Sequence, residues 1–237
     1  MKNARNSVLV FAGSGGLGLE ICKKFLSENF QVYFTSQNKS KINKILGLLK
    51  KNNLNDVVKG LYCDASKEKD INKIIKKFFR QAGKNRIIVN CIGSFEYDGI
   101  QSISSKKLSK TFLINTFPTI LITKYISLHK SKNEKVKVYS IGSSSSYDGF
   151  EKTIAYCASK HALLGAIRSL NKELIKKNIY ISNINPGSIK TKMGKKVRNQ
   201  KFSEFISPNT IADFIFDISK LKNPAFIEDI FLRRLVK

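Results

Sequence analysis

Three residues in the second half of the chain have types and spacing suited to proton transfer. Tyr156 and Lys160 are four positions apart in a segment with helical spacing, so their side chains share one face of a helix. Ser143 lies upstream, just past an apolar run typical of a strand. A phenol with a pKa of about 10 is a poor acid at neutral pH, and a nearby ammonium lowers that pKa. A serine hydroxyl can hold a carbonyl oxygen as charge builds on it, so the set suits hydride transfer to a carbonyl.

A glycine-rich segment lies between the first predicted strand and the first predicted helix. Residues 11–18 read Phe-Ala-Gly-Ser-Gly-Gly-Leu-Gly. Glycines let backbone amides approach a phosphate closely, and the N-terminus of a helix adds partial positive charge. The alternative for the glycines alone is a tight turn without a ligand. The expected contacts with a dinucleotide here are Gly13, Ser14, Gly15, Gly16, Leu17 and Gly18.

The end of the second predicted strand favours NADP(H) over NAD(H). An NAD site usually has an Asp or Glu there to hold the ribose hydroxyls, but residues 36–41 read Ser-Gln-Asn-Lys-Ser-Lys. Hydroxyl, amide and ammonium groups suit a 2′-phosphate, so Ser36 and Gln37 are candidate contacts. The alternative is that Lys39 and Lys41 only begin a solvated helix.

Asp64 follows the third predicted strand and has two possible roles. Its carboxylate can accept a hydrogen bond from the adenine amino group of a dinucleotide. It can equally cap the helix that follows, for which Ser66 is the expected N-cap residue. The sequence leaves these two roles open.

The elements that must position these residues alternate along the chain. Apolar runs predict strands at residues 7–11, 31–36, 56–62, 86–90, 135–141, 180–185 and 226–231. Helical spacing predicts helices at residues 16–28, 40–51, 66–81, 106–129, 153–177 and 209–221, with a kink at Pro118 in the fourth. This alternation predicts a single α/β domain over residues 1–237: a Rossmann-like, doubly wound parallel sheet with helices on both faces. Ligands of such sheets bind at the carboxyl ends of the strands, where the strand order reverses.

Composition excludes several classes of protein. The chain has 237 residues, 42% of them hydrophobic, which excludes intrinsic disorder. No apolar stretch is long enough to span a membrane, and the apolar run after the basic start is too short for a signal peptide, so we expect a cytoplasmic protein. The four cysteines form no CxxC pair and the two histidines have no metal-ligand spacing, so we expect free thiols and no metal site.

The chain is strongly basic. Lys and Arg number 43 against 17 Asp and Glu, a formal net charge of +26. Because the lysines are spread over nearly every predicted helix, solvated polar faces explain most of them. An attraction to anionic partners is the alternative, although a nucleic-acid partner is not favoured.

Together these features resemble the short-chain dehydrogenase/reductase family, from Val8 to about Leu221. The family's Thr-Gly-x-x-x-Gly-x-Gly motif falls on residues 11–18, with Phe11 and Ala12 in place of Thr-Gly. Its Asn-Asn-Ala-Gly segment falls on residues 90–93, which read Asn-Cys-Ile-Gly. Ser143, Tyr156 and Lys160 have the family's catalytic spacing, and residues 185–193 resemble its Pro-Gly stretch.

The resemblance implies an NADP-dependent reductase of ketones or aldehydes that acts as a homodimer or homotetramer. It implies four catalytic residues, Ser143, Tyr156, Lys160 and Asn115, of which Asn115 bends its helix and holds a water in the proton path. It implies further cofactor contacts at Asn90, Gly93, Tyr156, Lys160, Ile189 and Thr191. The alternative is a non-catalytic dinucleotide-binding protein that regulates a partner or associates with nucleic acid.

The substrate is less well defined by the sequence. The chain is somewhat similar to 3-oxoacyl-carrier-protein reductases, and acyl carrier proteins are acidic, so a basic surface would assist docking. A small, basic substrate lid is expected over residues 188–207. The substrate pocket is expected to be bounded by aromatic and apolar side chains, which could equally belong to the core or an interface: Phe95, Tyr97, Tyr147, Phe150 and Met193.

Overall fold

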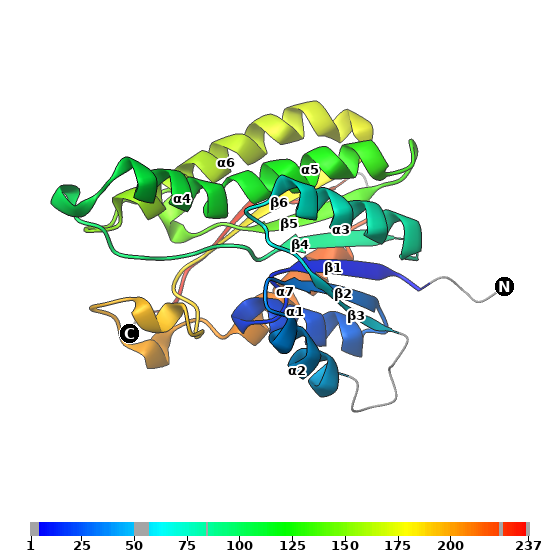
Figure 1. The fold of residues 1–237 in the computed structure, drawn as a ribbon, viewed down its shortest axis with the longest axis horizontal. Coiled ribbons are helices and arrows are strands. Elements are labelled where there is room, and N and C mark those ends of the chain that lie inside the picture. The colour runs from blue at the N-terminus through cyan, green and yellow to red at the C-terminus, as the bar shows by residue number, and fades with distance from the viewer. Residues whose placement is uncertain (1–4, 50–56, 84, 223–224, 236–237) are drawn as a thin grey trace.

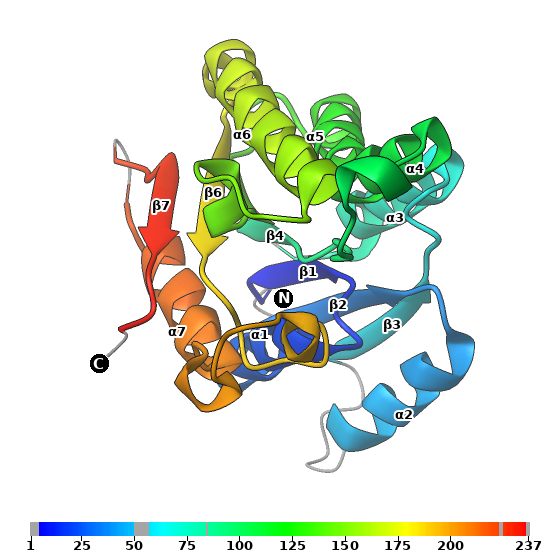
Figure 2. The same cartoon turned by 90° about the vertical axis from the view of Figure 1, so that its left-hand side faces the viewer.

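One parallel sheet forms the centre of the molecule. The computed structural model describes residues 5–49, 57–83, 85–222 and 225–235. Within them, seven parallel strands lie in the order β3-β2-β1-β4-β5-β6-β7 (Figures 1 and 2). The strands are Ser7–Phe11 (β1), Gln31–Ser36 (β2), Val58–Tyr62 (β3), Arg86–Asn90 (β4), Val136–Ile141 (β5), Ile179–Pro186 (β6) and Asp229–Leu232 (β7). This topology confirms the predicted doubly wound α/β fold.

Helices cover both faces of the sheet. They are Gly16–Ser27 (α1), Lys39–Leu49 (α2), Glu68–Gln81 (α3), Ser105–Asn115 (α4), Phe117–His129 (α5), Ile154–Leu174 (α6) and Pro208–Ser219 (α7). Figures 1 and 2 show α1, α2 and α7 below the sheet, and α3 to α6 above it. Each layer buries its own apolar cluster, with Phe25 and Phe216 in the lower one and Phe78 and Ile122 in the upper one. The central strands are therefore buried on both faces, which is why they read as continuous apolar runs.

The predicted helix over residues 106–129 is in fact two helices. The first ends at Asn115 and the second begins at Phe117, with Thr116 between them. Pro118 lies in the first turn of α5, where its missing N–H leaves no helical hydrogen bond unmade. The Thr116 hydroxyl donates to the carbonyl of Ser159 at 2.9 Å, which ties this break to α6.

Two further boundaries differ from the expectations, and two others cannot be compared with the structure. Ser66 does not cap α3, which begins at Glu68; its N–H and hydroxyl donate to Asp64 instead. The last strand is Asp229–Leu232, shifted toward the C-terminus from residues 226–231. The predicted helix end at residues 50–51 and the predicted strand start at residue 56 lie outside the described residues.

The strand order reverses between β1 and β4. From β1 the chain proceeds outward through β2 to β3, and then crosses back to β4 on the other side of β1. Connections that leave two neighbouring strands in opposite directions open a crevice at the carboxyl ends of those strands. The glycine-rich loop after β1 and residues 91–98 after β4 lie on the two sides of this crevice.

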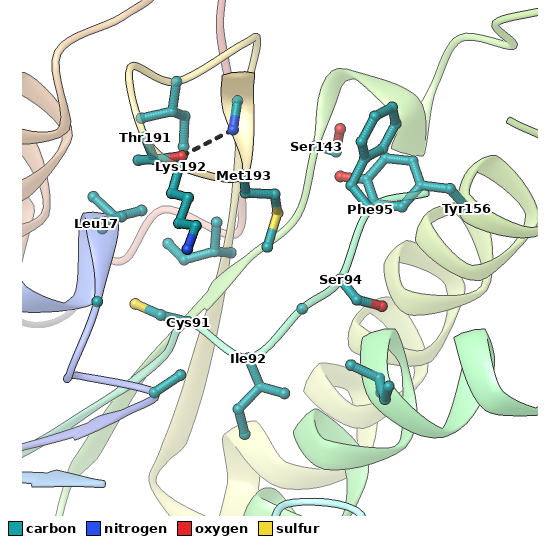
Figure 3. Close-up of a pocket in the computed structure, with 18 of the residues that line it drawn as sticks. Leu17, Cys91, Ile92, Ser94, Phe95, Ser143, Tyr156, Thr191, Lys192 and Met193 are labelled. Carbon is teal, nitrogen blue, oxygen red and sulfur yellow. Dashed lines mark hydrogen bonds between the residues drawn. The ribbon is translucent and has the colours of Figure 1, made fainter. Parts of the chain in front are cut away.

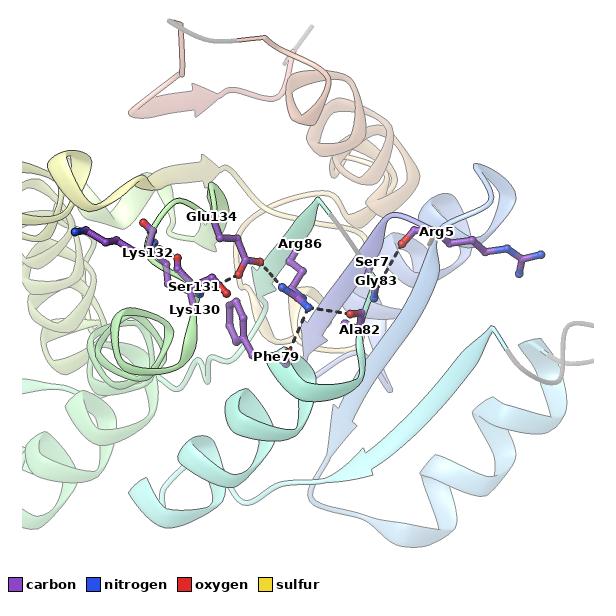
Figure 4. Close-up of polar contacts among 10 residues, drawn as sticks. All are labelled: Arg5, Ser7, Phe79, Ala82, Gly83, Arg86, Lys130, Ser131, Lys132 and Glu134. Atoms are coloured by element: carbon purple, nitrogen blue, oxygen red, sulfur yellow. Dashed lines mark hydrogen bonds and ion pairs between the residues drawn. The ribbon is translucent and has the colours of Figure 1, made fainter. Parts of the chain in front are cut away.

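Arg86 links several elements at the end of the sheet opposite the crevice (Figure 4). Its guanidinium donates to the carbonyls of Phe79 and Ala82 at the C-terminus of α3, at 3.2 and 2.9 Å. It also forms an ion pair with Glu134 at 2.5 Å. A cation is favourable at a helix C-terminus because it meets the negative end of the helix dipole. One side chain therefore links α3, the start of β4 and the loop before β5.

Candidate active site

A cleft of about 1550 Å³ opens at the carboxyl edge of the sheet. Its walls come from the glycine loop, the ends of β4, β5 and β6, the start of α6 and residues 186–200 (Figure 3). Most of the residues predicted for the site line it: Ser14, Gly15, Gly16, Leu17, Gly18, Ser36, Gln37, Asp64, Gly93, Ser143, Tyr156, Lys160, Ile189 and Thr191. The other three, Gly13, Asn90 and Asn115, lie behind the cleft wall.

The glycine loop forms a cradle that side chains would fill. A Cβ at Gly18 would lie 2.6 Å from the carbonyl oxygen of Ala12. Gly16 has a φ of +44°, and a Cβ there would lie 3.2 Å from the Thr191 side chain. Ala12, which stands in place of a family glycine, has a φ of 55°, and its N–H donates to the Thr35 hydroxyl at 3.0 Å. A tight loop that leads into the N-terminus of α1 fits a dinucleotide diphosphate.

Polar groups without an acid surround the end of β2. The hydroxyls of Ser14 and Ser36 are 2.8 Å apart, and Gln37, Asn38 and Lys41 line the cleft beside them. Lys39 does not line the cleft. These hydroxyl and amide groups offer hydrogen bonds at this end of the cleft, and Lys41 adds a positive charge.

Asp64 makes local contacts next to this end of the cleft. Its Oδ1 accepts hydrogen bonds from the N–H and the hydroxyl of Ser66, at 3.1 and 2.7 Å, and its Oδ2 pairs with Lys67 at 3.3 Å. The Ser66 hydroxyl, followed by the Ser66 N–H and Lys67, lowers the pKa of this carboxyl. Asp64 therefore closes a turn before α3 while it also faces the cleft.

Asn115 joins three segments behind the site. Its Oδ1 accepts from the N–H of Ser94 at 2.8 Å, and its Nδ2 donates to the Ser94 carbonyl and the Ser159 hydroxyl, at 3.1 and 3.0 Å. The Ser159 hydroxyl in turn donates to the carbonyl of Tyr156 at 2.7 Å. Asn90 is similarly engaged, since its Nδ2 donates to the Thr119 hydroxyl at 2.8 Å. Both buried amides thus hold the backbone around the cleft.

Ser143, Tyr156 and Lys160 meet at one end of the cleft. Figure 3 shows the oxygens of Ser143 and Tyr156 facing each other. The Lys160 ammonium lies 5.9 Å from the centre of the Tyr156 ring and donates to the carbonyl of Ile141 at 2.9 Å. The two positions share one face of α6, as their spacing predicts. A hydroxyl, a phenol and an ammonium therefore converge where a substrate oxygen can bind.

Burial shifts the titration of both α6 groups. It raises the pKa of the Tyr156 phenol, and a hydrogen bond with Ser143 lowers it in part. Burial lowers the pKa of Lys160 to about 8, with Cys91 acting in the opposite direction. Burial also raises the pKa of the Cys91 thiol to about 12. At neutral pH the site therefore contains a protonated phenol, a largely protonated amine and a neutral thiol.

A buried polar network that the sequence did not reveal supports Ser143. Its N–H donates to the Oδ1 of Asn185 at 3.2 Å, and the Nδ2 of Asn185 donates to Asp229 on β7 at 2.6 Å. Asn183 donates to the same Asn185 oxygen at 3.0 Å. A Cβ at Gly142 would lie 2.1 Å from that oxygen, so only glycine fits before Ser143. The alternation of Asn183 and Asn185 along β6 is the one local sequence signal that could have indicated this polar network.

Residues 188–206 form a loop closed at its base. Lys190 donates its N–H to the carbonyl of Ile206, and Ile206 donates its own to Ser188, both at 2.9 Å. Inside the loop, the Gly194 N–H donates to the Thr191 hydroxyl at 3.1 Å. Figure 3 shows the Lys192 side chain reaching into the cleft toward Cys91.

Four of the five expected pocket residues line the cleft: Phe95, Tyr97, Phe150 and Met193. Tyr147 does not. Its hydroxyl donates to Asp229, and its ring packs edge to face against Phe231, 5.6 Å between ring centres. Tyr147 therefore belongs to the Asn185–Asp229 network behind Ser143. Residue type alone could not distinguish this role from pocket lining.

Among the described residues, no three His, Cys, Asp or Glu side chains are grouped so as to hold a metal ion. In the same part of the chain, every helix is too short or too polar to cross a membrane.

Comparison with known proteins agrees with this geometry. The family model described as short chain dehydrogenase matches residues 6–201. Dehydrogenase/reductase SDR family member 4 of Caenorhabditis elegans is 29% identical over 188 residues, 79% of this chain and 72% of that protein. A 3-oxoacyl-[acyl-carrier-protein] reductase of Buchnera aphidicola subsp. Schizaphis graminum is 27% identical over 207 residues, 87% of this chain and 83% of that protein.

Solved structures share the whole fold. An alcohol dehydrogenase from the archaeon Thermococcus sibiricus, complexed with 5-hydroxy-NADP, has a TM-score of 0.85 at 18% identity, covering 97% of each chain. An actinorhodin polyketide ketoreductase variant with NADPH has a TM-score of 0.85 at 19% identity, covering 97% of this chain and 95% of that one. With the family model matched over most of its length, the chain belongs to the short-chain dehydrogenase family of NAD(P)-dependent oxidoreductases.

Proposed function

We propose that this protein reduces ketones or aldehydes to alcohols with NADPH, and that Tyr156 donates the proton. One observation carries the proposal: the phenol of Tyr156, the hydroxyl of Ser143 and the ammonium of Lys160 converge in the same cleft as the glycine cradle. When bound there, the reduced cofactor supplies a hydride to the carbonyl carbon.

Tyr156 is the proton donor in this proposal. Burial raises the pKa of its phenol, whereas the sequence led us to expect Lys160 to lower it, so the proton is present at neutral pH but is held more tightly than in water. Stabilisation of the phenolate must therefore assist its transfer to the carbonyl oxygen. The hydroxyl of Ser143 donates a hydrogen bond to the same oxygen as charge develops on it. The Lys160 ammonium, 5.9 Å from the Tyr156 ring, stabilises the phenolate that remains after proton transfer. Asn115 is linked to Tyr156 through Ser159, which supports a role in positioning this part of α6. We further propose that Asn115 holds a water in the path by which the proton is replaced.

Preference for NADPH over NADH is part of the proposal. The glycine loop, Asp64, Gly93, Ile189 and Thr191 would hold the dinucleotide, with Gly13 and Asn90 shaping the wall behind it. The support for a 2′-phosphate is the cluster of Ser14, Ser36, Gln37 and Lys41 without an acid at the end of β2.

The net charge and the relatives of this chain support a proposal for its partner. Relatives of this chain include 3-oxoacyl-[acyl-carrier-protein] reductases, and acyl carrier proteins are acidic. A chain with a net charge of +26 would attract such a carrier, so we propose a carrier-bound 3-oxoacyl group as one substrate. We further propose a single domain over residues 1–237 with residues 188–207 as a substrate lid, acting in the cytoplasm as a homodimer or homotetramer.

The test is consumption of NADPH, and of NADH in parallel, against a panel of ketones, aldehydes and 3-oxoacyl thioesters. Tyr156→Phe should remove turnover and leave NADPH binding within about twofold, because the ring and the cradle stay in place. Tyr125→Phe on α5, whose hydroxyl donates to Glu68, is the matched control and should retain activity. Turnover by Tyr156→Phe at the wild-type rate would refute the assigned proton donor. NADH used as well as NADPH would refute the cofactor preference.

A further inference from the structure

An aromatic wall leads from the reacting end of the cleft to its rim. The Phe95 ring packs edge to face against the Tyr156 ring, with 4.9 Å between centres, and against the Tyr97 ring at 5.1 Å. The guanidinium carbon of Arg198 lies 4.7 Å from the centre of the Tyr97 ring. Figure 3 shows Phe95 lying across Tyr156 beside Ser143. Phe95, Tyr97 and Arg198 all line the cleft.

The wall is held from several directions. The N–H of Arg198 donates to the Tyr97 hydroxyl at 2.7 Å, and the Lys107 ammonium donates to the Tyr97 carbonyl at 2.9 Å. The next residue, Asp98, is buried, and its carboxylate accepts from the N–H of Ala155 at the start of α6 at 2.9 Å. The wall is thus fixed to the helix that carries Tyr156, and Arg198 has a defined place at its outer end.

The Arg198 guanidinium is available to a ligand. No carboxylate of the described residues lies within 4.0 Å of it, whereas the nearby acid of the same loop, Glu204, pairs with Lys201 and Arg234. A guanidinium presents a planar set of N–H donors that matches a carboxylate or a phosphate.

The surroundings of Arg198 favour an anion as well. Lys110, Lys152 and Lys192 also line the cleft. The acids among the lining residues are Glu151, paired with Lys152 at 3.2 Å, and Asp64, paired at the far end. The substrate end of the cleft therefore has a surplus of positive charge, which attracts anions and repels cations.

We propose that Arg198 binds an anionic group of the substrate, so that this reductase prefers carbonyl compounds with a carboxylate or phosphate several bonds from the carbonyl. The carbonyl lies at Tyr156 and Ser143, an apolar chain follows the rings of Phe95 and Tyr97, and the anion meets Arg198 at the rim. This inference rests on the proposed carbonyl reductase function and names its substrate class.

Matched substrate pairs test the inference. The first pair is 7-oxooctanoate and its methyl ester, and the second is 7-oxooctyl phosphate and the corresponding neutral alcohol. The anionic member of at least one pair should have a KM about tenfold lower, and the pair that shows it identifies the anion as carboxylate or phosphate. Arg198→Leu should raise the KM of that anionic substrate about tenfold, and should leave kcat and the KM of the neutral partner within about twofold.

Lys196→Leu is the matched control, since it removes the same charge from the same loop at an exposed position outside the cleft lining, and it should keep the preference. Equal KM values within both pairs would overturn the inference, as would an anion preference that Arg198→Leu leaves unchanged. Absence of NADPH consumption with every compound would instead refute the proposed function. The two failures are therefore distinguishable.

Discussion

Replacement of Lys160 by Met should stabilise the fold of the nucleotide-free protein. Lys160 is 3% exposed, and burial lowers its pKa from 10.5 to about 8. The Lys160 amine binds its proton more tightly in the unfolded chain than in the folded one. At neutral pH this difference of about 2.5 pKa units lowers the stability of the fold by about 3 kcal/mol. Met fills a similar volume without a charge. The lost hydrogen bond to the Ile141 carbonyl costs about 1 kcal/mol, which leaves a net gain of about 2 kcal/mol.

The sign of the effect gives it a pH signature. A lysine whose folded pKa is lowered destabilises the fold fully below about pH 8, and this destabilisation disappears as the pH rises toward the unfolded value of about 10.5. The advantage of Lys160→Met over the wild type should therefore shrink by about 2 kcal/mol between about pH 7 and about pH 9.5. Other titrating groups are common to both proteins and cancel in this difference.

Urea unfolding of both proteins without nucleotide, at equal protein concentration and at both pH values, measures the effect. Lys172→Met on the exposed face of the same helix is the control and should change stability by less than about 0.5 kcal/mol. A Lys160→Met protein that is less stable than the wild type near neutral pH would refute the reasoning. So would a stability difference that stays constant across the two pH values.

Two other substitutions probe the cradle and the far end of the sheet. Gly18→Ala places a Cβ 2.6 Å from the backbone oxygen of Ala12, so the loop must shift and the Kd for NADPH, measured by fluorescence titration, should rise at least about tenfold. Gly47→Ala, which meets nothing within 4 Å on α2, should leave that Kd unchanged and serves as the control. Arg86→Met should lower the free energy of unfolding by about 3 kcal/mol, because it leaves the Glu134 carboxylate largely buried without its partner. Arg86→Met combined with Glu134→Gln should recover part of that loss in urea unfolding, and no recovery would contradict the ion-pair explanation.

The sheet was predictable because its strands are buried on both faces. All five residues of β1 and four of the five in β4 are buried, and such strands appear in the sequence as unbroken apolar runs. The last strand, β7, is half-buried throughout, so its pattern is weaker and its predicted position was displaced. The break at Thr116 was not placed because a proline fits either a kinked helix or the first turn of a new one.

Within the site, spacing along one helix was sufficient to predict that the side chains of Tyr156 and Lys160 lie together, since residues four apart share a face. It could not reveal partners contributed by distant segments. Asn185 and Asp229 are 44 residues apart in the chain, and Tyr97 and Arg198 are 101 apart. In a chain with 43 Lys and Arg, nothing local marks Arg198 as a residue of the cleft rim. Tertiary contact alone separates these residues from other polar side chains.

The departures from the family pattern fall where the structure tolerates them. Ala12 replaces a glycine, and its positive φ costs about 1 kcal/mol, but its side chain lines the open cleft. Gly18 is retained, and there a Cβ would meet the backbone of Ala12 and Gly13.

Cys91 replaces an asparagine and faces the cleft, where burial keeps its thiol neutral. A neutral thiol does not compensate the charge of Lys160, and no carboxylate of the described residues lies within 4.0 Å of that ammonium. Among the described residues, the buried cation therefore has no ionic partner. Desolvation destabilises this cation, and it also strengthens the field of the ammonium at Tyr156, because water screens that field less. A carboxylate introduced beside Lys160 would stabilise the buried cation, but its negative charge would cancel the field of the ammonium at Tyr156.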